Sequence, residues 1–131
     1  MNTTAQLPNV RTSANDSVLF FTTEQQYRHT ATNFKYSDGV KALADQFECN
    51  WFLDLCFFNA KHEKALQKEE YITWKLERQF KNNKPTDKFV ATATDDEGNI
   101  KFQQKVPFSD INTDSVKLFF WEGMLLLPSE C

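Results

Sequence analysis

The residue best placed to do chemistry is Asp54, a single carboxylate within the apolar run WFLDLCFF over residues 51–58. A carboxylate buried without partners is costly and has a raised pKa, so a protein must neutralise it, hydrogen-bond it or place it beside a cleft. Asp54 could work with His29 as a general acid or base in a pocket. It could instead be a buried anchor, accepting hydrogen bonds from His29, Arg28 or nearby amides. The sequence favours the anchor, because structural networks perturb carboxylates as active sites do.

Other catalytic and metal-binding patterns are incomplete. Asp54 and Cys56 are two positions apart, about 200° around a helix, so they cannot meet as a nucleophile pair. The pair His62-Glu63 lacks the second histidine of a zinc helix, and the three glycines form no phosphate-binding loop. The three cysteines are an odd set without CxxC spacing, which argues against a disulfide framework and a zinc site. We therefore expect no catalytic residues, no cofactor and no metal.

Two predicted turns carry side chains suited to binding another protein. The turn Asp95-Asp96-Glu97 concentrates three carboxylates that could contact a basic surface. Trp121-Glu122 lies at another turn, where the indole either folds back on the sheet or anchors a partner. We interpret these five residues as the candidate partner-binding site.

The elements that must position these residues are helices followed by strands. Ser37-Asp38 is typical of a helix N-terminus, and a second helix is expected over 51–66 after a break at Asn50. From residue 70 the apolar period changes to two, which predicts strands. Turns are expected at 82–85, 95–99 and 121–123. The pattern predicts an α+β fold in which two N-terminal helices pack on one face of a four- to five-stranded antiparallel meander.

The 131-residue chain has the length of one domain. Residues 1–17 are polar and aperiodic, which predicts a flexible tail before a single domain over 18–131. Thr23 is expected to cap a short helical turn over 25–27. No signal peptide and no stretch of about 20 apolar residues is recognisable, so we expect a cytoplasmic protein without membrane contact.

Charge argues against one class of partner. The chain carries 15 basic and 18 acidic residues, a formal net charge of -3. A nucleic-acid-binding domain is normally basic, so this balance does not indicate direct nucleic acid binding.

Five stretches give the chain a resemblance to a known family. They are FFTTEQQYRH (20–29), YSDGVKALA (36–44), WFLD (51–54), TWKLE (73–77) and MLLLPSE (124–130). In this order they resemble a small domain family of uncharacterised function encoded by bacteriophages, prophages and plasmids. The resemblance brings no established catalytic residues. It implies an accessory protein of mobile DNA, a class in which many members bind and disable a host defence system.

Together these observations predict a non-enzymatic, protein-binding accessory protein. It would inhibit a bacterial defence system, in the manner of an anti-CRISPR protein, by occluding a surface of a host protein or ribonucleoprotein complex. The alternative hypothesis is a small enzyme or ligand-binding domain that uses Asp54 and His29 in a pocket. A third hypothesis is a homodimer formed through a sheet edge or an aromatic surface.

Overall fold

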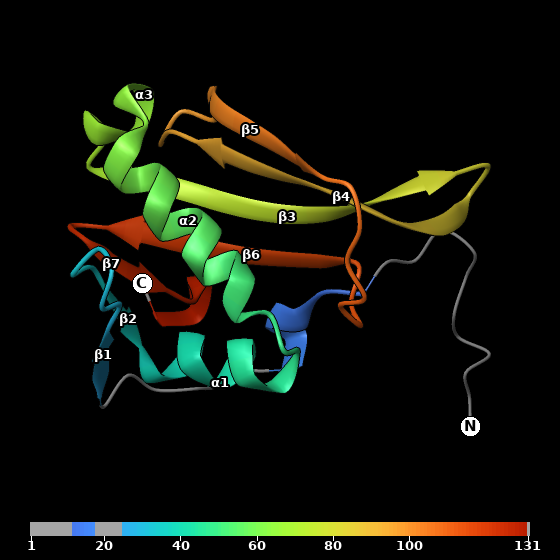
Figure 1. Cartoon of the computed structure of the whole chain (residues 1–131), viewed down its shortest axis with the longest axis horizontal. Coiled ribbons are helices and arrows are strands. Elements are labelled where there is room, and N and C mark those ends of the chain that lie inside the picture. The colour runs from blue at the N-terminus through green and yellow to red at the C-terminus, as the bar shows by residue number, and fades with distance from the viewer. Residues whose placement is uncertain (1–11, 18–24, 131) are drawn as a thin grey trace.

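The structure is a computed structural model that describes residues 12–17 and 25–130. The strands are β1 (Gln26–Arg28), β2 (Lys35–Ser37), β3 (Tyr71–Lys81), β4 (Lys84–Thr94), β5 (Ile100–Val106), β6 (Ser115–Trp121) and β7 (Met124–Leu126). The helices are α1 (Asp38–Gln46), α2 (Asn50–His62) and α3 (Lys64–Gln67), with the 3-10 turns η2 (Ala14–Ser17) and η3 (Pro128–Glu130). The strands form one sheet in the order β1-β2-β7-β6-β3-β4-β5 (Figure 1).

The prediction of a four- to five-stranded antiparallel meander behind two N-terminal helices is wrong. The short strands β1 and β2 precede the helices, and β2 pairs in parallel with β7 near the end of the chain, Tyr36 lying opposite Leu125. The described residues therefore form a seven-stranded mixed sheet with three helices. Strands of three residues are too short to show alternation in a sequence, which is why they were missed. Strand β1 also replaces the helical turn expected over 25–27, and Thr23 lies outside the described residues.

The predicted helix starts agree with the structure better than the predicted helix ends do. Ser37 caps α1, its Oγ accepting the Val40 N–H at 3.1 Å, as predicted. The Ser37 hydroxyl also donates to Glu130 Oε1 at 2.6 Å, which ties the start of α1 to η3. The single helix expected over 51–66 is divided, because Glu63 is extended and separates α2 from α3.

Three predicted hairpin turns are confirmed. Asn82 and Asn83 both have positive φ, 53° and 64°, and join β3 to β4 in a two-residue turn of the kind that suits the strand twist. Gly98 takes a φ of 86° in the β4–β5 turn. Glu122 and Gly123, at 49° and 78°, join β6 to β7.

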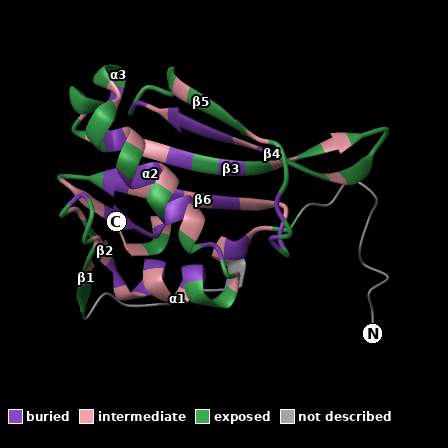
Figure 2. Ribbon diagram, viewed as in Figure 1, coloured by how far each residue is buried: buried purple, intermediate pink, exposed green. Residues whose placement is uncertain are grey.

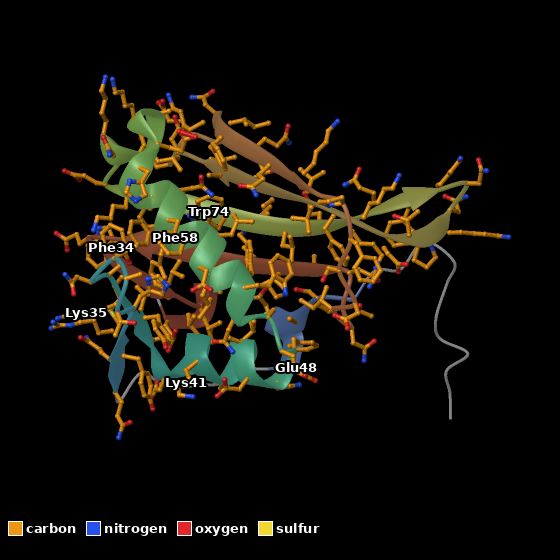
Figure 3. The ribbon with its side chains drawn as sticks, viewed as in Figure 1. Phe34, Lys35, Lys41, Glu48, Phe58 and Trp74 are labelled. Atoms are coloured by element: carbon orange, nitrogen blue, oxygen red, sulfur yellow. The ribbon has the colours of Figure 1, made fainter. Side chains whose placement is uncertain are left out.

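The helices cover one face of the sheet (Figure 1). Buried positions alternate with half-buried or exposed ones along β3 and β6 (Figure 2). Trp74, beneath α2 in Figure 3, is fully buried and makes an edge contact with Phe102 at 6.1 Å between ring centroids. Phe52 and Phe57 of α2 are also fully buried in the same cluster. The opposite face of β3 and β6 carries polar and aromatic side chains, and no helix of the described residues covers it.

Residues 12–17 lie along the part of β6 that β7 leaves unpaired. Ser13 pairs in parallel with Ser115, and the Asn15 side chain both donates to the carbonyl and accepts from the N–H of Lys117, each at 2.7 Å. Ala14 is fully buried. The sequence predicts a flexible tail over residues 1–17. Of these, the structure describes only 12–17, and residues 1–11 lie outside the described part of the chain.

Candidate functional site, an acidic and aromatic cleft

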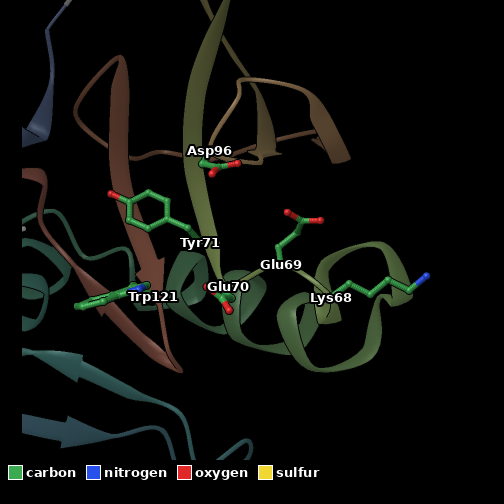
Figure 4. A pocket seen from close by; sticks show the side chains of 6 residues that line it. All are labelled: Lys68, Glu69, Glu70, Tyr71, Asp96 and Trp121. Atoms are coloured by element: carbon green, nitrogen blue, oxygen red, sulfur yellow. The ribbon is translucent and has the colours of Figure 1, made fainter.

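A cleft lies at the end of the sheet where β3 begins and β6 ends (Figure 4). Its volume is about 500 Å³. It is lined by Lys68, Glu69, Glu70, Tyr71, Asp96 and Trp121. Tyr71 and Trp121 lie opposite each other in the pairing of β3 with β6, so their side chains share a face of the sheet. We call this hollow the acidic–aromatic cleft.

Three carboxylates and one lysine give the cleft a negative balance. Trp121 is 48% exposed although it is one of the largest apolar side chains in the protein. Carboxylates attract a cation by charge, and an indole face attracts it through the quadrupole of the ring. The acidic–aromatic cleft is therefore suited to a positively charged group.

A second hollow of about 360 Å³ adjoins the first, because Glu69 and Glu70 line both. Its floor is apolar, with Phe34, Leu66 and Phe120 among the lining residues, and Glu122 stands at its rim. The backbone N–H of Glu122 points to the carbonyl of Glu70 at 3.5 Å. The connection from α3 to β3 thus forms a ridge of carboxylates between two hollows.

The carboxylates of the turn at 95–97 have different roles. Asp95 is buried, and its Oδ1 accepts the N–H groups of Asn99 at 2.8 Å and Glu97 at 2.9 Å. These bonds, the one from Asn99 above all, outweigh burial and lower the pKa of Asp95. Lys101 Nζ approaches the other oxygen at 3.8 Å. Asp95 therefore organises the turn, whereas Asp96 and Glu97 are exposed.

This division also accounts for the one group of potential metal ligands found among the described residues. Oxygens of Asp95, Asp96 and Glu97 lie within 4.8 Å of one another. Both oxygens of Asp95 already accept hydrogen bonds from within the turn, Oδ2 taking one from the side chain of Asn99 at 3.2 Å. The cluster is explained by the turn itself.

Of the five residues interpreted as a partner-binding site, the structure brings Asp96 and Trp121 together in the acidic–aromatic cleft. Glu122 lines the adjoining hollow. Sequence reasoning missed Glu69, Glu70 and Tyr71. Their Glu-Glu-Tyr run at the start of a predicted strand was the available signal, but nothing in the sequence placed it beside the β4–β5 turn.

Asp54 is not buried, contrary to the sequence-based expectation. Its side chain is 56% exposed, on the solvent side of α2, while Leu53 and Phe57 face the core. The hydrogen bond that the anchor hypothesis expected is present, with Asp54 Oδ1 lying 2.7 Å from His29 Nε2. The His29 ring rests on Phe57, 4.6 Å between centroids. The pair therefore joins the β1–β2 loop to α2.

His29 also contacts the hydroxyl of Thr32. Asp54, His29 and Thr32 thus follow one another as the acid, base and hydroxyl of a hydrolase triad do. Thr32 Oγ1 lies 2.7 Å from His29 Nδ1. Thr32, however, is only 5% exposed, and its Oγ1 accepts the Phe34 N–H at 3.4 Å. The backbone N–H of His29 bonds the Phe34 carbonyl at 2.7 Å. The hydroxyl thus closes the loop over 29–34 and does not face a substrate.

The described cysteines are poor nucleophiles. Burial raises the pKa of Cys49 to about 12 and that of Cys56 well above its ordinary value. Both are free thiols within the core. A thiol needs its thiolate form to attack, so neither side chain is activated at neutral pH.

The fold and the cleft define a small α+β protein with a mixed sheet and an acidic–aromatic cleft. The chain belongs to an uncharacterised family, because residues 13–131 match the Family of unknown function (DUF6876). No curated protein and no solved structure matches it. The resemblance to an uncharacterised family is thus confirmed, whereas the phage or plasmid origin stays a prediction. Among the described residues, no helix combines the length and apolar character that a membrane crossing requires.

Proposed function

We propose that this protein binds a basic segment of another protein in its acidic–aromatic cleft. The observation that carries the proposal is the convergence of Trp121 and Tyr71 with Glu69, Glu70 and Asp96 around one hollow. These residues come from three separate parts of the chain, and the fold alone brings them together. The role is one of recognition and does not require catalysis.

A lysine or arginine side chain of the partner is the group that fits. A cation over an aromatic ring contributes about 0.5–1 kcal/mol at an exposed site and about 2 kcal/mol when it is desolvated. The carboxylates supply the matching charge and speed association by steering the basic partner to this end of the molecule. The apolar floor of the adjoining hollow, with Phe34 and Phe120, can accept the aliphatic stem or a neighbouring apolar residue.

We further propose that the partner is a host protein or ribonucleoprotein defence complex. The protein would then be an accessory factor of a phage or plasmid that acts in the bacterial cytoplasm and inhibits defence by surface occlusion, as anti-CRISPR proteins do. Two points support this version. The sequence resembles a family carried by mobile DNA, and surfaces that hold nucleic acid are rich in the lysine and arginine that the cleft favours.

The test is a variant that reverses the charge of the cleft without disturbing the fold around it. Glu69→Lys with Asp96→Lys changes two exposed or half-exposed carboxylates and leaves Asp95 to hold its turn. Glu48→Lys with Asp110→Lys is the matched control, since it makes the same change in net charge. Glu48 precedes α2, and the cleft residues 68–71 follow α3, which lies at the other end of α2 (Figure 1), about 20 Å away for a 13-residue helix.

The measurement is the plaquing efficiency of phage on bacteria with an active defence system, paired with capture of the purified defence complex. We expect wild-type protein and the control variant to raise plaquing and bind the complex, and the cleft variant to do neither. A cleft variant as active as wild type would show that the cleft is not the binding surface. A wild-type protein that binds but leaves plaquing unchanged would reject the anti-defence role and keep the protein-binding role.

A further inference from the structure

The mild net charge conceals a separation of charge within the fold. The face of the sheet opposite the helices carries one lysine from each of four consecutive strands. These are Lys117 on β6, Lys75 on β3, Lys88 on β4 and Lys105 on β5. None of the four forms an ion pair with a described residue. We call this surface the basic sheet face.

Two of these lysines are direct neighbours. Lys75 lies opposite Lys117 in the antiparallel pairing of β3 with β6. Like charges placed directly opposite on one face of a sheet repel and destabilise it. Glu77, two positions from Lys75, is the acidic residue that alternation places on this face of β3. An anion bound between the two lysines would relieve their repulsion.

Hollows accompany both pairs of lysines. One of about 380 Å³ is lined by Lys75 and Lys117, by the carboxylate of Glu77, and by Ser13, Asn15 and Ser115. Another, of about 420 Å³, lies at the base of the β3–β4 hairpin and has Lys88 and Lys105 in its lining. Both are therefore on the basic sheet face, and each leaves space for an anion beside a pair of lysines.

Aromatic rings lie on the same face, next to the first pair of lysines. Phe119 is two positions from Lys117, whose Nζ is 5.4 Å from the centre of the ring. Tyr71 contacts Phe119 with 5.4 Å between ring centroids. Both rings are half-exposed. Aromatic rings interleaved with lysines are the surface on which unpaired bases stack while their phosphates are neutralised.

We propose that the basic sheet face binds single-stranded nucleic acid. The strand would cross from β6 to β5, a span of roughly 14 Å at the usual strand spacing. Its phosphates would lie at the Lys75–Lys117 and Lys88–Lys105 pairs, with a base stacked on Phe119. A duplex fits less well, because its bases are already stacked and the open sheet face cannot enter a groove. This inference goes beyond the proposed function and does not depend on it.

Fluorescence anisotropy with labelled 20-nucleotide single strands of DNA and RNA tests the proposal. Each phosphate neutralised in a single-strand complex contributes about -0.7 to the slope of the logarithm of the binding constant against the logarithm of the salt concentration. Four lysines therefore predict a slope of about -3. Lys75→Glu with Lys117→Glu should weaken binding at least tenfold. Lys61→Glu with Lys64→Glu makes the same charge change on exposed residues of α2 and α3, which cover the other face of the sheet, and it should leave binding unchanged.

A second variant tests stacking separately from charge. Phe119→Leu keeps an apolar side chain on β6, so the sheet should hold, and thermal melting checks that it does. We expect it to weaken single-strand binding by roughly fivefold or more, within the range that a lost stacking contact gives, with the salt slope unchanged. The cleft variant Glu69→Lys with Asp96→Lys should bind the strand at least as tightly as wild type.

Three results would overturn the inference. The first is no binding of either single strand by wild-type protein at about 50 mM salt, where phosphate contacts are strong. The second is an equal loss of affinity in the control Lys61→Glu with Lys64→Glu. The third is equal affinity for a 20-base-pair duplex or for polyglutamate, which would indicate a surface for any polyanion, an acidic protein included.

Discussion

Asp114→Asn should destabilise the protein strongly, because both carboxylate oxygens of Asp114 accept hydrogen bonds. Its Oδ1 accepts from Arg78 Nε at 2.8 Å, and its Oδ2 accepts from the backbone N–H of Thr12 at 2.9 Å. Arg78 also donates to three backbone carbonyls at 2.6, 3.0 and 3.2 Å and lies over the Phe89 ring at 4.7 Å. This pair joins β3, β6 and the N-terminal segment.

The size of the effect follows from counting acceptors. Asparagine has one acceptor oxygen where aspartate has two, so either Arg78 or Thr12 would face an amide NH₂ and lose its partner. Both side chains of the ion pair are mostly buried, with 13% and 18% exposed. A lost charge-assisted hydrogen bond costs about 1.5–3 kcal/mol, and we therefore expect a loss of about 2–3 kcal/mol in the free energy of unfolding. For a chain of this length that lowers Tm by about 10 °C.

The effect should depend on pH. Burial alone would raise the pKa of Asp114, but the bonds from Thr12 and Arg78 outweigh it and lower the pKa. The unfolded value is about 3.9, so the stabilisation is complete above about pH 5 and is lost as the pH falls through the folded-state pKa. The free energies of unfolding of wild type and variant should differ most at neutral pH and become equal at acidic pH.

Urea unfolding followed by tryptophan fluorescence at pH 7 and about pH 2.5 measures both points. Asp110→Asn is the control, since Asp110 is an exposed carboxylate in the same connection. A loss below about 0.5 kcal/mol at pH 7 would refute the estimate of the pair's contribution. A loss that is equal at the two pH values would refute its electrostatic origin.

Three further predictions concern other parts of the fold. Gly39→Ala should lower the free energy of unfolding by about 1–3 kcal/mol in a urea titration, because a Cβ there would lie 2.7 Å from the Glu130 carboxylate; an unchanged midpoint would show that this contact yields. Asp54→Asn should cost about 1 kcal/mol by the same assay and leave partner capture intact, since Asp54 is an exposed anchor; lost capture would instead favour a site there. Cys49 and Cys56 should resist alkylation in native protein and react in urea, read by peptide mass spectrometry, and rapid native labelling would contradict their burial.

The local features of the fold could be predicted where a short motif has a strong conformational preference. Ser37 before an amphipathic stretch gave the start of α1, and Asn82-Asn83 and Gly98 gave two hairpins, because Asn and Gly tolerate the positive φ that those turns require. The parallel pairing of β2 with β7 depends on residues almost ninety positions apart. No local pattern specifies such a contact.

The error at Asp54 has a physical cause. An apolar run on both sides suggested a buried helix, but α2 has a solvent side, and it is marked by Asp54 and by Phe58, which is 42% exposed. The exposed phenylalanine concealed the helical period. The partner of Asp54 was nevertheless among the expected ones, since His29 is the side chain that it binds.

The net charge of the chain adds together surfaces of opposite charge that the fold separates. Along β3, Tyr71 beside the carboxylates of the cleft and Lys75 on the basic sheet face are four residues apart, roughly 13 Å. The Debye length at physiological ionic strength is about 8 Å, so the two fields are largely screened from each other. A nucleic acid bound on the basic sheet face would cross from β6 to β5, and a turn of its chain along β3 toward Tyr71 would bring a phosphate to Glu69 and Asp96. The carboxylates would then oppose binding in that direction and present the adjoining cleft to a basic protein. A ribonucleoprotein offers both ligands side by side, which is why the two proposed surfaces fit one partner better than two unrelated ones.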